Sequence, residues 1–343
     1  MGVARTHRTF HQKENRMTTP DALRVFDLHC DTLDALAMND TGPYADLGVA
    51  KGGTLGHSGL QLSADRLAGM AWCQCLAIWV PDDLHGITAH QWYRKVAGWF
   101  LADVQSEPQS VTRVTDASQI EASLAPGHLT GMLTVENGSP IGHDLGVIDE
   151  FARDGVKMVT LTWNGKNSIA SGNVTTDGLS SFGREVVRSL EEHRIAVDVS
   201  HLNDHGFADL LGVATRPFVA SHSNSRAVCD HPRNLTDDQF RAIRDMGGLV
   251  GINYFRQFIT TRDAPADGEV TFDELSAHIE HFLNLGGERV LALGSDFDGS
   301  TVPTWLDGCQ HVPAFHDRVA GRFGQKVADR MFFQNAPEFY LRQ

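Results

Sequence analysis

Eight short apolar runs, separated by segments with helical patterning, constrain the fold of this 343-residue chain more than any other feature. Each run is rich in β-branched or other apolar residues and is bounded by Gly, Asp, Asn or Pro, which is typical of buried strands. In chain order they read LRVFDLHCD, AWCQCLAIWV, TGMLTVEN, VKMVTLTWN, RIAVDVSH, RPFVASHS, GGLVGINY and RVLALGSDFDG. Strands that alternate with helices predict a parallel sheet, and eight of them predict an α/β fold of the (β/α)8, TIM-type barrel class.

Several of the intervening segments show recognisable helix ends. Thr236 and Gln239 have the spacing of a capping box, as do Thr271 and Glu274. Gly286 lies where a helix C-cap is expected, because glycine adopts the left-handed conformation of that position without strain. These signals predict helices that begin near residues 237 and 272.

A doubly wound open sheet is the alternative fold, but no G-x-G-x-x-G motif follows the first apolar run. Residues 81–128, between the second and third runs, are longer than one helix requires and are expected to form extra helices. We expect one catalytic domain over residues 21–343, preceded by a disordered tail over residues 1–20.

The composition excludes several classes of partner. The formal charge of −14 and the pI near 5.6 disfavour nucleic acid and anionic membranes, because both would repel most of the surface. The polar, basic N-terminus has no apolar stretch of the kind found in a signal peptide or a membrane anchor. Five cysteines scattered over a long chain do not resemble a disulfide framework, so a reducing, cytoplasmic location is expected.

The first apolar run ends in a polar stripe. If the run is a strand, Asp27, His29 and Asp31 share one face, and Leu28 and Cys30 share the other. The same strand logic places Cys73 and Cys75 on one face of the second run, where core packing is favoured over a metal pair.

Polar residues also stand at the ends of later runs. In barrel enzymes the chemistry lies at the carboxyl ends of the strands, and the candidates there are His29, Asp31, Glu136, His201, His222 and Asp296. Three histidines and three carboxylates offer more ligands than one tetrahedral zinc ion requires. The pattern therefore suggests two metal ions that share a bridging carboxylate.

Six ordered motifs resemble those of the membrane (renal) dipeptidase family, which are zinc metallopeptidases with an amidohydrolase-like barrel. The motifs are DLHCDTL, VENG, LTWN, DVSH, ASHSNSRAVCDHPRNL and GSDFDG. The resemblance implies two Zn²⁺ ions per chain, one held by His29 and Asp31 and the other by His201 and His222, with Glu136 as the bridge. It also implies hydrolysis of small dipeptides, L-Xaa-D-Xaa among them, by a hydroxide that bridges the metals.

The resemblance further assigns roles around the metals. Asp296 would accept a proton from the hydroxide, and Arg233 would bind the substrate carboxylate, for which its planar guanidinium is suited. Trp163 stands where mammalian members have a histidine that stabilises the oxyanion, so we expect the donor there to be weakened or moved to Asn164. Trp163, Asn164 and Tyr254 are predicted substrate-binding residues, and a homodimer is expected from the family.

Two other functions stay open at this point. One keeps the metals but hydrolyses another small amide, a lactam or a cyclic imide, as the tryptophan at position 163 allows. The other is a catalytically silent barrel that binds a ligand. The presence of Asp296 argues against a silent barrel, because a binding protein needs no proton acceptor beside a metal.

Overall fold

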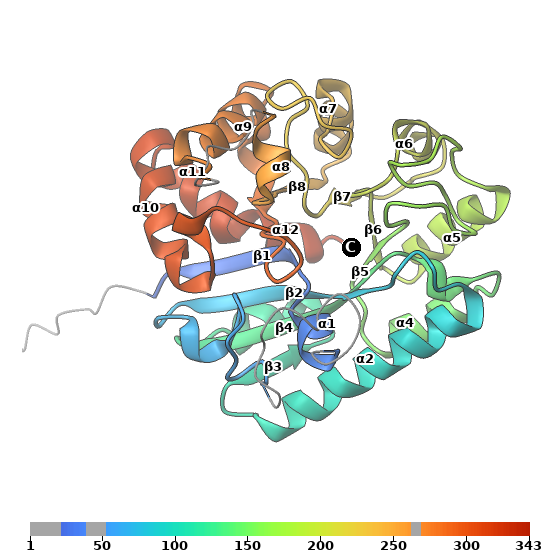
Figure 1. Cartoon of the computed structure of the whole chain (residues 1–343), viewed down its shortest axis with the longest axis horizontal. Helices are drawn as coiled ribbons and strands as arrows, with labels where there is room; N and C mark the ends of the chain where they lie inside the picture. The colour runs from blue at the N-terminus through green and yellow to red at the C-terminus, as the bar shows by residue number, and fades with distance from the viewer. Residues whose placement is uncertain (1–21, 39–52, 262–268) are drawn as a thin grey trace, which may run out of the picture.

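The computed structural model describes residues 22–38, 53–261 and 269–343, and these form a ring of parallel strands surrounded by helices (Figure 1). The predicted tail over residues 1–20 lies outside the described residues. The strands are β1 (Arg24–Cys30), β2 (Ala71–Trp79), β3 (Val111–Val114), β4 (His128–Glu136), β5 (Met158–Thr160), β6 (Ala196–Asp198), β7 (Val219–Ala220), β8 (Leu249–Ile252) and β9 (Leu291–Leu293).

The sheet runs in the order β2-β1-β9-β8-β7-β6-β5-β4-β3, and β2 pairs in addition with β4. This last pairing closes eight strands into the predicted barrel. The helices are α1 (Thr32–Ala37), α2 (Gly86–Ser106), α3 (Ile120–Ser123), α4 (Gly146–Arg153), α5 (Ser181–Glu192), α6 (Asp204–Leu211), α7 (Asp237–Asp245), α8 (Arg256–Ile259), α9 (Phe272–Asn284), α10 (Val312–Phe323), α11 (Gln325–Asp329) and α12 (Asn335–Tyr340).

The segment between the second and third barrel strands differs from its prediction. It contains the long helix α2 and the short helix α3, but also the strand β3, which the sequence reading missed. β3 pairs with residues 129–132 of β4, and β5 pairs with residues 134–136 of the same strand. β3 therefore extends the sheet beside the first half of β4 without becoming a barrel strand.

The prediction that Leu28 and Cys30 share one face of β1 is wrong. The pairing of β1 with β2 shifts register between Asp27 and Cys30, as at a β-bulge. Leu28 accordingly packs in the cluster that fills the barrel, whereas Cys30 packs in the cluster between barrel and helices. Because of this irregularity, the side chain of His29 need not follow the strict alternation of faces along the strand.

The barrel interior is filled by side chains rather than open. Phe26, Cys73 and Cys75 lie in it, fully buried, as expected for Cys73 and Cys75. Helix α12 closes the end of the barrel at which the strands begin, where the Tyr340 ring stacks on Phe26 with 5.6 Å between centroids. The Tyr340 hydroxyl lies 3.4 Å from Cys75 Sγ. Full burial of such a ring stabilises the fold by roughly 1.5–3 kcal/mol.

The predicted helix ends are confirmed. Thr236 caps α7 through the backbone N–H of Gln239, and Thr271 caps α9 through that of Glu274, both as complete capping boxes. Gly286 has a φ of 86°, in the left-handed region that a C-terminal glycine provides.

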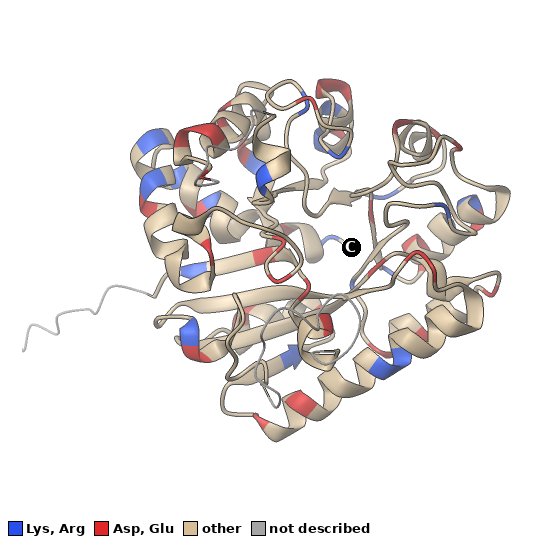
Figure 2. Ribbon diagram, in the orientation of Figure 1, with Lys and Arg blue, Asp and Glu red and all other residues tan. Residues whose placement is uncertain are grey.

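Charged residues of both signs lie on the outer helices, for example on α2 and α10, while the barrel strands consist mostly of uncharged residues (Figure 2). Within the described ranges, no helix is both long and apolar enough to cross a bilayer.

His278 on α9 joins two loops at the barrel mouth. Its Nδ1 accepts a hydrogen bond from the Ser225 N–H (3.1 Å), and its Nε2 donates to the Ile259 carbonyl (2.9 Å). This arrangement requires a neutral ring, and burial lowers the pKa of His278 to about 4.

We expect this histidine to destabilise the fold in acid. Since its pKa is lower in the folded state than in the unfolded chain, the free energy of unfolding falls as the pH drops from about 6.5 towards 4, by about 3 kcal/mol in total. His278→Gln, which retains an acceptor and a donor but does not titrate, should show a shallower fall. Urea unfolding of both proteins between pH 7 and 4 measures the difference. Parallel curves would contradict the assignment.

Candidate active site

A cavity of about 650 Å³ opens at the carboxyl ends of the barrel strands. Its lining includes seven of the residues predicted from sequence, namely Asp31, Glu136, Trp163, Asn164, His201, Arg233 and Asp296. His29 and His222 lie beneath them, each 1% exposed. The structure therefore brings all the predicted metal ligands to one end of the barrel.

Left-handed residues turn the chain sharply at the ends of several strands. Asn137, His201 and Asp296 have φ values of 77°, 70° and 61°. Such values are uncommon outside glycine and concentrate at functional sites. Close packing extends to Gly299, where an added Cβ would lie 1.8 Å from Asp31 Oδ2. A side chain at position 299 would therefore displace that carboxylate.

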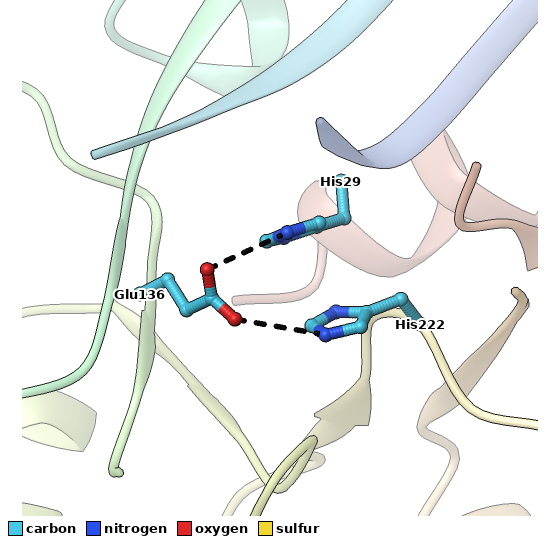
Figure 3. Close-up of side chains that lie close together, drawn as sticks. All are labelled: His29, Glu136 and His222. Carbon is cyan, nitrogen blue, oxygen red and sulfur yellow. Dashed lines mark ion pairs between the residues drawn. The ribbon is translucent and has the colours of Figure 1, made fainter. Parts of the chain in front are cut away.

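Glu136, the last residue of β4, lies between the histidines. Figure 3 shows its carboxylate directed at His29 on one side and His222 on the other. Oε2 lies 3.7 Å from His29 Nε2. Oε1 lies 2.9 Å from His201 Nε2 and 3.7 Å from His222 Nε2. Each carboxylate oxygen thus faces a different group of candidate ligands.

The first group surrounds His29. Its Nε2 lies 3.5 Å from Asp31 Oδ2 and 3.8 Å from Asp296 Oδ1. The second group consists of His201 and His222, whose Nε2 atoms are 3.0 Å apart. Ligands bound tetrahedrally at about 2.0–2.1 Å lie about 3.3 Å from one another, which is close to these separations.

Two of the candidate metal-binding atoms also have no hydrogen-bond partner. His29 Nε2 and Asp31 Oδ1 are buried without any hydrogen bond. Buried polar atoms are rarely left unsatisfied in folded proteins, so these atoms are suited to hold a cation. Imidazole nitrogens with carboxylate oxygens suit zinc and other divalent transition metals. The residues present therefore fit a divalent metal centre.

Electrostatics support the same conclusion. Burial lowers the pKa of His201 and of His222 well below the usual range, so both rings are neutral and can act as ligands. Burial also disfavours charge on His29, but Glu136 and Asp31 outweigh it and raise the pKa of His29 to about 10. Burial raises the pKa of Glu136. The cluster therefore attracts positive charge.

Arg233 lies in the cavity wall and is 5% exposed. Its Nε and Nη2 are buried without a hydrogen-bond partner, and its guanidinium lies 5.2 Å from the ring centre of Phe258. Burial lowers its pKa to about 10, which leaves it charged at neutral pH. A buried cation with unused donors is suited to an anionic group of a ligand.

Trp163 and Asn164, two of the predicted substrate-binding residues, both line the cavity. Trp163 packs edge to face on Trp79 with 5.0 Å between ring centroids. Asn164 Oδ1 lies 3.0 Å from His201 Nδ1, on the side of the ring that faces away from Glu136. Asn164 thus contacts a candidate ligand as well as the cavity.

The predicted contact of Tyr254 with substrate needs correction. The side chain is fully buried and packs edge to face between Phe297 and Phe315, at centroid distances of 5.6 and 5.7 Å. Tyr254 follows β8, but its ring turns into the core between barrel and helices instead of entering the cavity. Its position therefore gives it a packing role.

Several residues of the cavity lining were not predicted from the sequence. Leu60 and Gln61 come from the segment before β2, where no motif marks them. Gln61 is fixed by Asp298, since its N–H donates to Oδ1 (2.8 Å) and its Oε1 accepts from the Asp298 N–H (2.6 Å). Asp298 lies within the GSDFDG motif, so that motif was the available signal. The aromatic side chains of Phe255 and Phe258 complete this wall.

A barrel of eight parallel strands with histidine and carboxylate ligands at its mouth defines the class of metal-dependent hydrolases. The model of the membrane dipeptidase family, peptidase family M19, matches residues 14–335. The chain therefore belongs to this family and is a metallo-dipeptidase, a hydrolase of peptide bonds.

The chain is also similar to individual proteins. A Klebsiella pneumoniae protein described as "Uncharacterized protein in pqqA 5'region" is 36% identical in an alignment of 203 residues that covers 57% of this chain and 73% of that protein. The structure of the dipeptidase AC, a metallo peptidase of family M19, is 25% identical with a TM-score of 0.80. A Rhodobacter sphaeroides metallo peptidase, liganded with a phosphinate mimic of L-Ala-D-Ala, is 24% identical with a TM-score of 0.81. Both alignments cover 94% of this chain and 99% of the other.

Removal of bound divalent metal should destabilise the protein. A ligand present at a thousand times its dissociation constant stabilises the folded state by about 4 kcal/mol. A chelator should therefore lower the unfolding temperature of metal-loaded protein, and calorimetry measures the shift. Glu136→Ala, which removes the central carboxylate, should respond much less to the chelator. Equal responses of wild type and variant would contradict a metal centre at Glu136.

Proposed function

We propose that the protein hydrolyses the peptide bond of dipeptides at a site that binds two Zn²⁺ ions. The observation that supports this most directly is the geometry of Glu136, whose two oxygens face two separate groups of ligands. His29 and Asp31 would hold one ion with Oε2, and His201 and His222 the other with Oε1. When bound, divalent cations polarise a carbonyl group and lower the pKa of water.

Asp296 is proposed as the proton acceptor. Its Oδ1 lies at the His29 group, and its Oδ2 accepts a hydrogen bond from Asn253 Nδ2 at 3.2 Å. Burial raises the pKa of Asp296 from its ordinary value, which brings it nearer to neutral pH. A carboxylate of this kind can accept a proton from water and donate it to the departing amine.

Arg233 is proposed to bind the free carboxylate of the dipeptide. Its two unpartnered nitrogens can donate two parallel hydrogen bonds to that group, an arrangement that lysine cannot reproduce. Binding of the carboxylate at Arg233 while the scissile carbonyl lies at the metal ligands would select substrates by length.

The remaining walls suggest apolar side chains in the substrate. Trp79 and Trp163 form one aromatic surface, and Phe255 and Phe258 form another. Asn164 directs its Oδ1 at His201, so its Nδ2 is the donor that it can offer to an oxyanion. We propose dipeptides with apolar residues as substrates. Since the Rhodobacter relative holds an L-Ala-D-Ala mimic, L-Ala-D-Ala is the first to test.

A second candidate function keeps the metals and replaces the dipeptide with another small amide, a lactam or a cyclic imide. It is favoured by Trp163, which presents an aromatic wall at a position where the mammalian members have a histidine. The two functions differ in their need for a carboxylate at Arg233. A silent ligand-binding barrel is disfavoured, because Asp296 lies with the metal ligands.

A cytoplasmic location and a homodimer also remain proposals. The location is supported by Cys30, Cys73, Cys75, Cys229 and Cys309, all buried free thiols, which suit a reducing compartment. The homodimer is supported by the resemblance to the family.

Replacement of Asp296 should separate catalysis from metal binding. Asp296→Asn retains the shape of the side chain but is a poor proton acceptor, so kcat for L-Ala-D-Ala should fall on the order of a hundredfold or more. Elemental analysis should still find two zinc ions per chain, as in wild type. His201→Ala should instead lose one of them. An Asp296→Asn enzyme with the activity of wild type would refute the role of Asp296.

Arg233 distinguishes a dipeptidase from a general amide hydrolase. Hydrogen bonds to charged partners contribute roughly 1.5–3 kcal/mol each, and 1.4 kcal/mol is a factor of ten. Arg233→Met should therefore lower kcat/KM for L-Ala-D-Ala by at least about tenfold. The same variant should barely change hydrolysis of L-Ala-D-Ala amide, because this substrate has no carboxylate to lose.

Arg226→Met is the matched control for this comparison. Arg226 lies in the same loop, but its guanidinium pairs with Asp204 and contacts the Asn234 carbonyl. If loop distortion caused the effect of Arg233→Met, Arg226→Met would slow both substrates in the same way. A wild-type enzyme that prefers the amidated substrate would favour the second candidate function.

A further inference from the structure

The two histidines of the second ligand group each have a hydrogen-bond partner on the side away from Glu136. His222 Nδ1 lies 2.7 Å from Ser221 Oγ, and His201 Nδ1 lies 3.0 Å from Asn164 Oδ1. A neutral imidazole has one N–H and one lone pair. The partner of Nδ1 therefore decides whether Nε2 is free to bind a metal ion.

Ser221 has a single hydroxyl proton and three possible acceptors. Its Oγ lies 2.6 Å from Asp198 Oδ2, 2.7 Å from His222 Nδ1 and 3.3 Å from Ser200 Oγ. A hydrogen bond to a carboxylate is stronger than one to a neutral nitrogen or hydroxyl, and this contact is also the shortest, so the proton points to Asp198. Ser221 Oγ can then only accept from His222 Nδ1, which places the proton on Nδ1 and the lone pair on Nε2.

Several hydrogen bonds fix the position of the Asp198 carboxylate. It is fully buried, and its Oδ1 accepts from the backbone N–H groups of Ser200 (3.0 Å) and Ser221 (2.9 Å). Thr160 Oγ1 donates to Oδ2 at 2.6 Å. The donors come from β5, from the turn after β6 and from the residue after β7, so three neighbouring segments fix one carboxylate.

A different partner, Asn164, favours the same tautomer of His201. An amide oxygen can only accept, so Asn164 Oδ1 requires a proton on His201 Nδ1. The Nε2 lone pair of His201 then points into the same space as the Nε2 lone pair of His222. The two Nε2 atoms are 3.0 Å apart. These two lone pairs repel each other, and the lone pair of His201 also faces Glu136 Oε1 at 2.9 Å, so the arrangement is favourable when a cation lies among the three atoms.

We propose that Ser221, Asp198 and Asn164 are positioning residues that fix the Nδ1–H tautomers of His222 and His201 and thereby set the affinity of this half of the site for a divalent metal. The proposal rests on the proposed function only in its use of a metal at this site. It adds residues outside the ligand set to the determinants of that metal.

Two serines that flank His222 provide a matched pair of variants. Ser221 and Ser223 are both buried, but the Ser223 hydroxyl contacts Ser200 Oγ at 3.4 Å. In metal-free protein labelled with ¹⁵N-histidine, NMR should show protonated Nδ1 for His222 in wild type and in Ser223→Ala. Ser221→Ala should lose this tautomer. A protonated Nε2 on His222 in wild type would overturn the proposal.

Metal affinity provides the second measurement. Loss of such a partner typically weakens metal binding by 10–100-fold. Competition with a chromophoric chelator should show this loss for Zn²⁺ in Ser221→Ala, with Ser223→Ala close to wild type. Equal affinities of the two serine variants would overturn the proposal.

Two variants of Asn164 provide an independent test if Ser221→Ala fails to fold. Asn164→Asp retains an acceptor for His201 Nδ1 and should bind zinc at least as tightly as wild type. Asn164→Leu should lose 10–100-fold in affinity. If both variants lose affinity equally, the contact has no positioning role. Because these measurements use no substrate, their failure is distinct from failure of the dipeptidase proposal, which only hydrolysis assays decide.

Discussion

The pairing of β2 with β4 is the constraint on which the rest of the structure depends. Nine consecutive residue pairs join the two strands, from Ala71 with His128 to Trp79 with Glu136. This pairing bypasses β3 and closes the barrel, so all strand ends meet at one rim. Glu136 is the last residue of that ladder. Closure therefore places the central carboxylate opposite histidines that come from distant parts of the chain.

Burial of so many ionisable groups is costly unless they share a compensating charge. The direction of the pKa shifts shows how the site responds: the carboxylates draw a proton to His29, while His201 and His222 stay neutral. A divalent cation can replace that proton and satisfy the unpartnered atoms. Arg233 provides a second positive charge in the cavity wall.

The sequence predicted much of this arrangement and failed where side-chain direction depends on distant neighbours. The capping box at Thr236 and the barrel fold were predicted because both follow from local patterns. Tyr254 was misplaced because its ring direction depends on Phe297 and Phe315, which belong to later parts of the chain. The separation of Leu28 from Cys30 depends on a register shift against β2, which strict alternation cannot anticipate.

What the sequence determined by itself was the order of strands and helices and the kinds of residue at the strand ends, since periodicity and capping act over a few residues. Tertiary structure alone decided which nitrogen of each histidine faces Glu136. Ser221 and Asn164 become partners of His222 and His201 only through the arrangement of strands and loops. The physical reason is that a hydrogen bond depends on distance and direction between atoms, and the folded barrel sets both.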